Sequence, residues 1–163
     1  MKKIFLASLL FSLLTGCSTI SDETLALVNK TAPAARVSFL DGDYVSLRRY
    51  RGKTVVLMFW ATWCSRSKTL ITELSDYART HKNPNTEFIA VSIDRFDRLS
   101  TLKNMIYLQG LDGVKHAFSG NDVRDEAYVS FRMIAIPTIV IIGPDGVVKG
   151  VDNDLDIVKE YVR

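Results

Sequence analysis

Cys64 is the residue in this chain whose type and surroundings best suit covalent chemistry. It follows a continuous apolar run, Thr54–Trp60, and precedes a segment with apolar residues at helical spacing. A thiol at the start of a helix faces unpaired backbone N–H groups and the positive end of the helix dipole, and both favour the thiolate. Arg66 adds positive charge nearby, and Ser67, one helical turn on, has a hydroxyl that can donate to the sulfur. By itself this pattern is equally compatible with a reactive thiol and with an inert buried cysteine.

The other cysteine, Cys17, ends an N-terminal stretch that has the form of an export signal. Lys2 and Lys3 precede an apolar run of eleven residues over 4–14. A membrane-spanning helix needs about 20 apolar residues. A basic segment, a short apolar run and small residues before a cleavage point are typical of a secretory signal. We therefore expect residues 1–16 to be a removable signal rather than a short transmembrane anchor or a buried first helix.

The string Leu14-Thr15-Gly16-Cys17 resembles the lipobox of bacterial lipoproteins. The resemblance implies cleavage before Cys17, a lipid on its thiol and acylation of its amine, and stable anchoring needs at least two acyl chains. Ser18, rather than an aspartate, comes next. By resemblance to Gram-negative sorting rules, this favours an outer-membrane anchor facing the periplasm. We expect residues 17–35 to form the lipidated cysteine and a tether, and residues 36–163 to form the folded domain.

Composition narrows the functional class. The chain has 163 residues, 47% hydrophobic and 24% charged, which suits a single globular domain. Its formal charge of +3 includes two lysines of the signal, so the mature protein is nearly neutral and offers no basic surface for nucleic acid. His81 and His116 are isolated and no metal-ligand spacing is present, so we expect neither a metal nor another cofactor.

The remaining pattern predicts alternating strands and helices. The strand–helix–strand section over 54–93 requires a parallel strand pair with a right-handed crossover, and a final hairpin adds antiparallel strands. The sequence therefore predicts an α/β fold whose central mixed sheet has helices on both faces. The other predicted elements are a hairpin over 37–39 and 44–47, helices over 65–79, 99–108, 122–129 and 155–162, and strands over 87–93, 114–118, 137–142 and 147–149.

The string Phe59-Trp60-Ala61-Thr62-Trp63-Cys64 resembles the active-site approach of thioredoxins, especially the membrane-anchored TlpA/ResA group. The resemblance extends over about residues 33–162. It implies a thioredoxin-like fold with a cis bond between Ile136 and Pro137. It also implies that this loop lies against Cys64, with Trp63, Ile136 and Pro137 lining the substrate site. Matching positions elsewhere are Gly42, Leu47, Gly52, Lys53, Tyr128, Arg132, Thr138, Asp145 and Gly146.

The chain departs from that family at the second cysteine of the Cys-x-x-Cys motif, which is Ser67 here. Thiol–disulfide exchange passes through a mixed disulfide that the second thiol normally breaks. With Cys17 acylated, no other thiol remains in the mature chain to do so. In addition, Met58 stands where thioredoxins have a buried aspartate, and the region of Leu70 lacks the acidic residue often found in the TlpA/ResA group.

Three functions are compatible with these residues. The first is exchange by a single thiol on envelope proteins or small thiols, isomerase-like or deglutathionylation-like, with Cys64, Ser67 and Arg66 in the catalytic site. The second is a non-catalytic module that captures or scaffolds envelope proteins. The third is a thiol peroxidase working through a sulfenic acid on Cys64, although the proline and threonine that precede a peroxiredoxin cysteine are missing. We expect specificity to reside in the insertion over 95–130, because loops on a fixed scaffold carry function.

Overall fold

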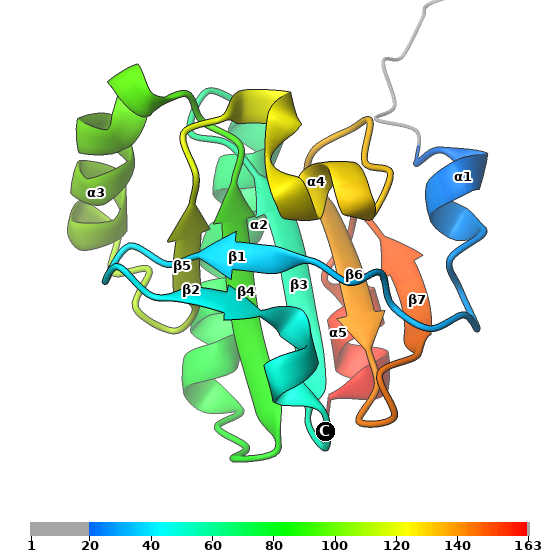
Figure 1. Cartoon of the computed structure of the whole chain (residues 1–163). Helices are drawn as coiled ribbons and strands as arrows, with labels where there is room; N and C mark the ends of the chain where they lie inside the picture. The colour runs from blue at the N-terminus through cyan, green and yellow to red at the C-terminus, as the bar shows by residue number, and fades with distance from the viewer. Residues whose placement is uncertain (1–19, 163) are drawn as a thin grey trace, which may run out of the picture.

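The computed structural model describes residues 20–162, so the predicted signal and Cys17 lie outside the described residues. The predicted α/β fold is confirmed, because five strands form one mixed sheet in the order β5-β4-β3-β6-β7 (Figure 1). The first three strands of the chain in this sheet run parallel, while β6 pairs antiparallel with β3 and β7 antiparallel with β6. The strands are β3 (Thr54–Trp60), β4 (Thr86–Ser92), β5 (Lys115–Phe118), β6 (Thr138–Ile142) and β7 (Val148–Asp152).

β3 is the central strand and separates two hydrophobic clusters. Successive side chains of a strand point to opposite faces, so a run that is apolar throughout suits a strand covered on both sides. Leu57 and Phe59 accordingly enter one cluster, and Met58 and Trp60 enter the other. All four side chains are fully buried, which fixes the end of the strand that precedes Cys64.

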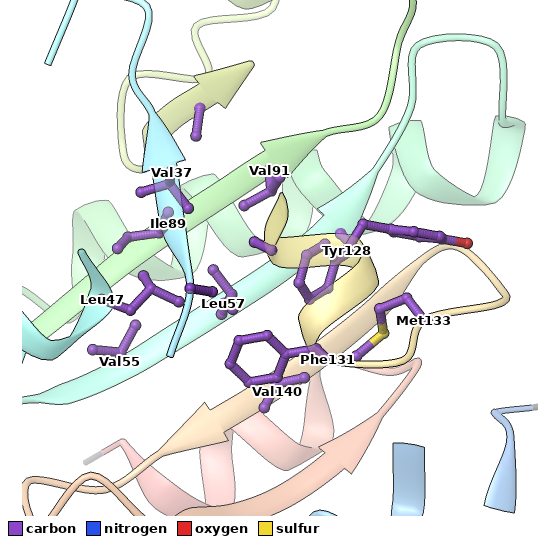
Figure 2. Close-up of a cluster of buried hydrophobic side chains, with 14 of the residues drawn as sticks. Val37, Leu47, Val55, Leu57, Ile89, Val91, Tyr128, Phe131, Met133 and Val140 are labelled. Atoms are coloured by element: carbon purple, nitrogen blue, oxygen red, sulfur yellow. The ribbon is translucent and has the colours of Figure 1, made fainter. Parts of the chain in front are cut away.

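Helices cover one face of the sheet, and a hairpin with a short helix covers the other. The first layer consists of α2 (Ser65–Thr80), α3 (Leu99–Leu108) and α5 (Asp156–Tyr161). In the view of Figure 1 the second layer lies in front of the sheet, and Figure 2 shows Leu57 and Val140 of the sheet meeting Phe131 between the two layers. Its elements are β1 (Arg36–Ser38), β2 (Tyr44–Ser46) and α4 (Glu126–Ser130). Residues 20–162 also contain three 3₁₀ turns: η1 (Leu47–Tyr50), η2 (Phe96–Arg98) and η3 (Asp122–Arg124).

The helix predicted over 122–129 is divided into η3 and α4. The break falls at Asp125, whose backbone leaves the helical region with φ −55° and ψ 137°. Its carboxylate accepts hydrogen bonds from the backbone N–H groups of Ala127 and Tyr128, which are at the start of α4. Asp125 is therefore an N-cap, and an N-cap requires a non-helical backbone.

The segment expected to be a tether belongs to the folded domain from Ile20 onward. It contains a short helix, α1 (Asp22–Leu25), and the buried Leu27. The backbone N–H of Asn29 donates to the carbonyl of Val148 at 2.8 Å, so the segment also borders β7. This segment has no strong helix or strand period, because single, irregularly spaced residues make these contacts. Within residues 20–162, no helix is long and apolar enough to cross a membrane.

Candidate thiol site

Cys64 lies where the end of β3 turns into α2, as the sequence predicted. It is the N-cap residue of the helix, with an extended backbone (φ −94°, ψ 114°) and no capping hydrogen bond from its side chain. Its carbonyl accepts from the N–H of Lys68, so the helix begins directly after it. The first turn of a helix has N–H groups without intrahelical partners, which favours negative charge at this position. The side chain is partly exposed and therefore accessible to a substrate.

The loop before β6 lies against the sulfur. The Sγ atom of Cys64 is 3.9 Å from the carbonyl oxygen of Ile136, in the geometry of a weak S–H···O hydrogen bond. The Ile136–Pro137 peptide bond is cis, as the resemblance implied. Three of the predicted site residues therefore come together from segments more than 70 positions apart in the sequence.

Ser67 is completely buried one turn into α2. Its hydroxyl has no hydrogen-bond partner in the described part of the chain. The expectation that Ser67 donates to the Cys64 sulfur is therefore wrong for this structure, in which the sulfur pairs with the carbonyl of Ile136. A buried hydroxyl without a hydrogen-bond partner costs free energy, so the Ser67 hydroxyl does not stabilise the fold through a hydrogen bond.

Arg66 is exposed and points to a different loop. Its guanidinium Nη2 donates to the side-chain oxygen of Asn153 at 2.9 Å, and Asn153 follows β7. The expected positive charge is present on the first turn of α2, but its hydrogen bond ties the helix to the loop before α5 and is not made to the sulfur. Sequence reasoning missed Asn153 because the two residues are 87 positions apart.

Two exposed apolar side chains border the site. Trp63, directly before Cys64, is 52% exposed, and Ile134, two residues before Ile136, is 69% exposed. The sequence singled out Trp63 but not Ile134, because a single apolar residue in a loop gives no pattern. Both leave exposed apolar surface in the segments that contain Cys64 and Ile136, which suits contact with a protein segment.

Asp94 is a buried carboxylate that the sequence did not identify as part of the site. It is completely buried just after β4 and accepts hydrogen bonds from the backbone N–H of Thr62 at 2.9 Å and from its hydroxyl at 2.7 Å. The hydroxyl of Ser92 donates to the same carboxylate at 2.7 Å. These three bonds, which we call the Asp94 clamp, fix the loop two residues before Cys64. A Ser-x-Asp sequence at the end of a buried parallel strand was the available signal.

The charge pattern elsewhere does not form a metal site. Within residues 20–162, no group of three or more His, Cys, Asp or Glu side chains is arranged to hold a metal ion. Met58 is buried in the helix-covered face, so the carboxylate that thioredoxins place there is replaced by a packing side chain.

Residues 52–148 match the model of a protein family described as thioredoxin-like. The chain belongs to the thioredoxin-like family. The curated protein named thiol-disulfide oxidoreductase ResA from Bacillus cereus is 27% identical over 147 residues, which cover 88% of this chain and 81% of that protein.

Solved structures support the same family fold. The thioredoxin domain of a thiol-disulfide oxidoreductase from Bacteroides vulgatus superposes with a TM-score of 0.71 at 23% identity, covering 83% of this chain and 98% of that one. A thiol:disulfide interchange protein from Bacteroides sp. has a TM-score of 0.69 at 25% identity, covering 85% and 91%. The thioredoxin-like fold implied by the sequence motifs is therefore confirmed.

Proposed function

We propose that this protein is a thiol-disulfide oxidoreductase that works with a single thiol, Cys64. The observation that carries the proposal is the position of that thiol, partly exposed at the start of α2 and 3.9 Å from the carbonyl of Ile136. The similar proteins from Bacillus and Bacteroides named as thiol-disulfide oxidoreductases support the reaction class. Ser67 at the second position of the motif supports the restriction to one thiol.

The proposed reaction has two exchange steps. The Cys64 thiolate attacks one sulfur of a substrate disulfide, so that a Cys64–substrate disulfide forms and the second substrate sulfur leaves as a thiolate. A thiol of the same substrate, or a small thiol such as glutathione, then loses its proton and attacks the mixed disulfide. The attack releases the Cys64 thiolate, so the protein ends the cycle in the same reduced state in which it began. Isomerisation and removal of glutathione from protein thiols both follow this scheme.

The substrate is held by the surfaces around the sulfur. The backbone of Ile136 lies beside Sγ, and an extended substrate segment can pair with such a loop as an added strand does. Trp63, the exposed residue directly before Cys64, gives this segment an apolar contact. Pro137, which is buried, holds the loop in place. We propose envelope proteins with thiols or disulfides, or small thiols, as the partners.

The proposed location is the cell envelope. Residues 1–16 have the form of a secretory signal and residues 14–17 that of a lipobox. We propose that Cys17 is lipidated and anchors the protein outside the cytoplasm, with Ser18 favouring the outer membrane facing the periplasm. Membrane fractionation of wild type and Cys17→Ser tests this proposal. A Cys17→Ser protein that is still cleaved and still bound to the membrane would contradict the proposal.

A second candidate function is a binding module that captures partners. It is favoured by the buried Ser67, because a serine hydroxyl cannot break a mixed disulfide. In this case Cys64 would form long-lived adducts with envelope proteins and would not turn over.

Turnover of a glutathionylated peptide distinguishes the two functions. The full lipidated protein in detergent is mixed with the peptide and excess glutathione, and release of the peptide thiol is followed. We expect many turnovers per wild-type molecule and none with Cys64→Ser, while Ser65→Ala, a change at the exposed first residue of α2, serves as the matched control. One stable adduct per molecule without turnover would contradict the enzymatic function and support the binding module. Consumption of peroxide without exchange would indicate the peroxidase.

A further inference from the structure

The first helix of the domain is fixed to the loop that contacts the Cys64 sulfur. The side chain of Thr24 in α1 is almost completely buried, and its hydroxyl donates to the carbonyl of Arg132 at 2.7 Å. Arg132 lies four residues before Ile136, in the loop that leads to β6. The hydroxyl of Ser21 contacts that of Thr24 at 2.8 Å, which holds the beginning of α1 at the same place.

Neighbouring residues make this attachment continuous. Ile20 packs against the same hydrophobic cluster as Met133, and Leu27 is buried in it. Figure 1 shows α1 at the end of the sheet where α4 and the loop before β6 also lie. Cys64 follows the carboxyl end of β3 at that same end, which we call the thiol edge. The described chain therefore begins at the thiol edge and not at the opposite end of the sheet.

Chain length then limits where a lipid on Cys17 can hold the domain. Two residues, Ser18 and Thr19, lie between Cys17 and Ile20, so three residue-to-residue steps join them, and at a maximum of about 3.6 Å per step the reach is roughly 11 Å. A domain of this size has a radius of gyration of roughly 15 Å. β4 alone, with seven residues at about 3.3 Å each, puts the opposite end of the sheet roughly 20 Å away. The reach is too short to turn that end toward the membrane.

We infer that the lipid anchor holds the thiol edge toward the bilayer, so that Cys64 acts on cysteines in protein segments close to the membrane surface. The inference rests on the lipidation of Cys17 in the proposed function and adds the orientation and the class of partner. Trp63 and Ile134 expose apolar surface on the thiol edge, and tryptophan is favoured at the membrane–water interface. A substrate far above the bilayer would instead require a long free tether, and residues 20–35 are packed onto the domain.

Energy transfer to a labelled membrane tests the orientation. The full lipidated protein is placed in vesicles of phosphatidylcholine and phosphatidylglycerol that contain a rhodamine-labelled lipid. A donor dye is attached to Cys64, or to position 85 in the double variant Cys64→Ser/Asn85→Cys. Asn85 is exposed just before β4, at the opposite end of the sheet. We expect energy transfer from position 64 to be at least about twofold greater than from position 85, because the two positions are separated by roughly 20 Å along the strand direction.

A linker variant is the matched control. Insertion of about 20 glycine and serine residues between Thr19 and Ile20 keeps the anchor and α1 but adds a mean reach of roughly 25 Å. Transfer from positions 64 and 85 should then become similar. Equal transfer from the two positions without the insertion, or greater transfer from position 85, would overturn the inference.

Flotation, energy transfer and peptide turnover are separate measurements, so a failure of this inference can be distinguished from a failure of the proposed function. A protein that does not float with the vesicles would contradict the lipid anchoring and, with it, the inferred orientation. Labelling and energy transfer do not depend on turnover. A protein that floats with its thiol edge toward the membrane but fails with the glutathionylated peptide would support the orientation while removing the exchange activity.

Discussion

Ser67 separates this protein chemically from a two-thiol oxidoreductase. It is buried one helical turn from Cys64, and its hydroxyl has no partner among residues 20–162. The importance of Cys64 could be predicted from residue types alone, because a cysteine between a buried strand and a helix is a local pattern. The contact of Cys64 with Ile136 was implied only by the family resemblance, and the partner of Arg66 could not be predicted, because Asn153 comes from a distant loop that only the fold brings near.

Restoring the second thiol tests the role of Ser67. Residues 64 and 67 are one helical turn apart, and a disulfide needs Cα atoms about 4.4–6.8 Å apart. Ser67→Cys should therefore form an internal disulfide and shorten the lifetime of mixed disulfides on Cys64, since the new thiol attacks them. Non-reducing mass analysis and the decay of a peptide adduct measure both effects. Thr69→Cys, exposed on the same helix, is the control and should do neither.

At the level of elements, the thiol is positioned by the junction between two parallel strands. β3 ends before the Thr62 loop and β4 ends before Asp94, and the Asp94 clamp joins the two ends. Strands with long apolar runs and α2 with its regular period were predicted within a residue or two. The clamp was not, since it depends on which strand ends are neighbours. The packing of α1 was missed for the same reason.

Asp94→Asn should weaken both the fold and the site. The amide places N–H groups where Thr62 and Ser92 donate, so buried donors lose their acceptor at a cost of about 1–3 kcal/mol or more. We expect a lower free energy of unfolding and a change in the rate at which iodoacetamide alkylates Cys64 in the folded protein. Thr62→Val, which removes the hydroxyl that donates to Asp94, should also change the alkylation rate, whereas Thr62→Ser, which keeps the hydroxyl, should alkylate at close to the wild-type rate.

Asp97→Asn is the matched control for the Asp94 clamp. Asp97 is three residues farther along, and its side chain is 76% exposed with one distant ion pair to Arg95. Exposed pairs of this kind contribute about 0–1 kcal/mol. A decrease in stability for Asp97→Asn as large as that for Asp94→Asn would show that the clamp has no special role.

At the level of the whole molecule, the two faces of the sheet have different tasks. The face covered by α2, α3 and α5 is a packed core that includes Trp60 and Phe118. The opposite face carries α4 and the loop before β6, to which α1 is attached. The Cys64 thiol and the proposed attachment point of the lipid therefore lie at one edge of the sheet, while the helix-covered face supplies stability. His116, on β5, is a half-buried histidine beside Trp60 on that face, and we expect its protonation to affect the stability of the fold.

The pH dependence of folding should report on His116. Burial lowers its pKa below the ordinary 6.5, although a hydrogen bond to the carbonyl of Leu111 at 2.7 Å opposes the shift. The folded state then binds fewer protons than the unfolded state. Stability is fully present above pH 6.5 and falls as the pH drops from 6.5 toward the lower folded-state pKa, by at most about 1.4 kcal/mol per pH unit. Denaturant unfolding followed by tryptophan fluorescence between pH 7.5 and about 5 measures this slope.

His116→Gln should flatten the slope, whereas His81→Gln, at the exposed end of α2, should leave it unchanged. An unchanged slope in His116→Gln would mean that the acid sensitivity of the fold arises from other groups.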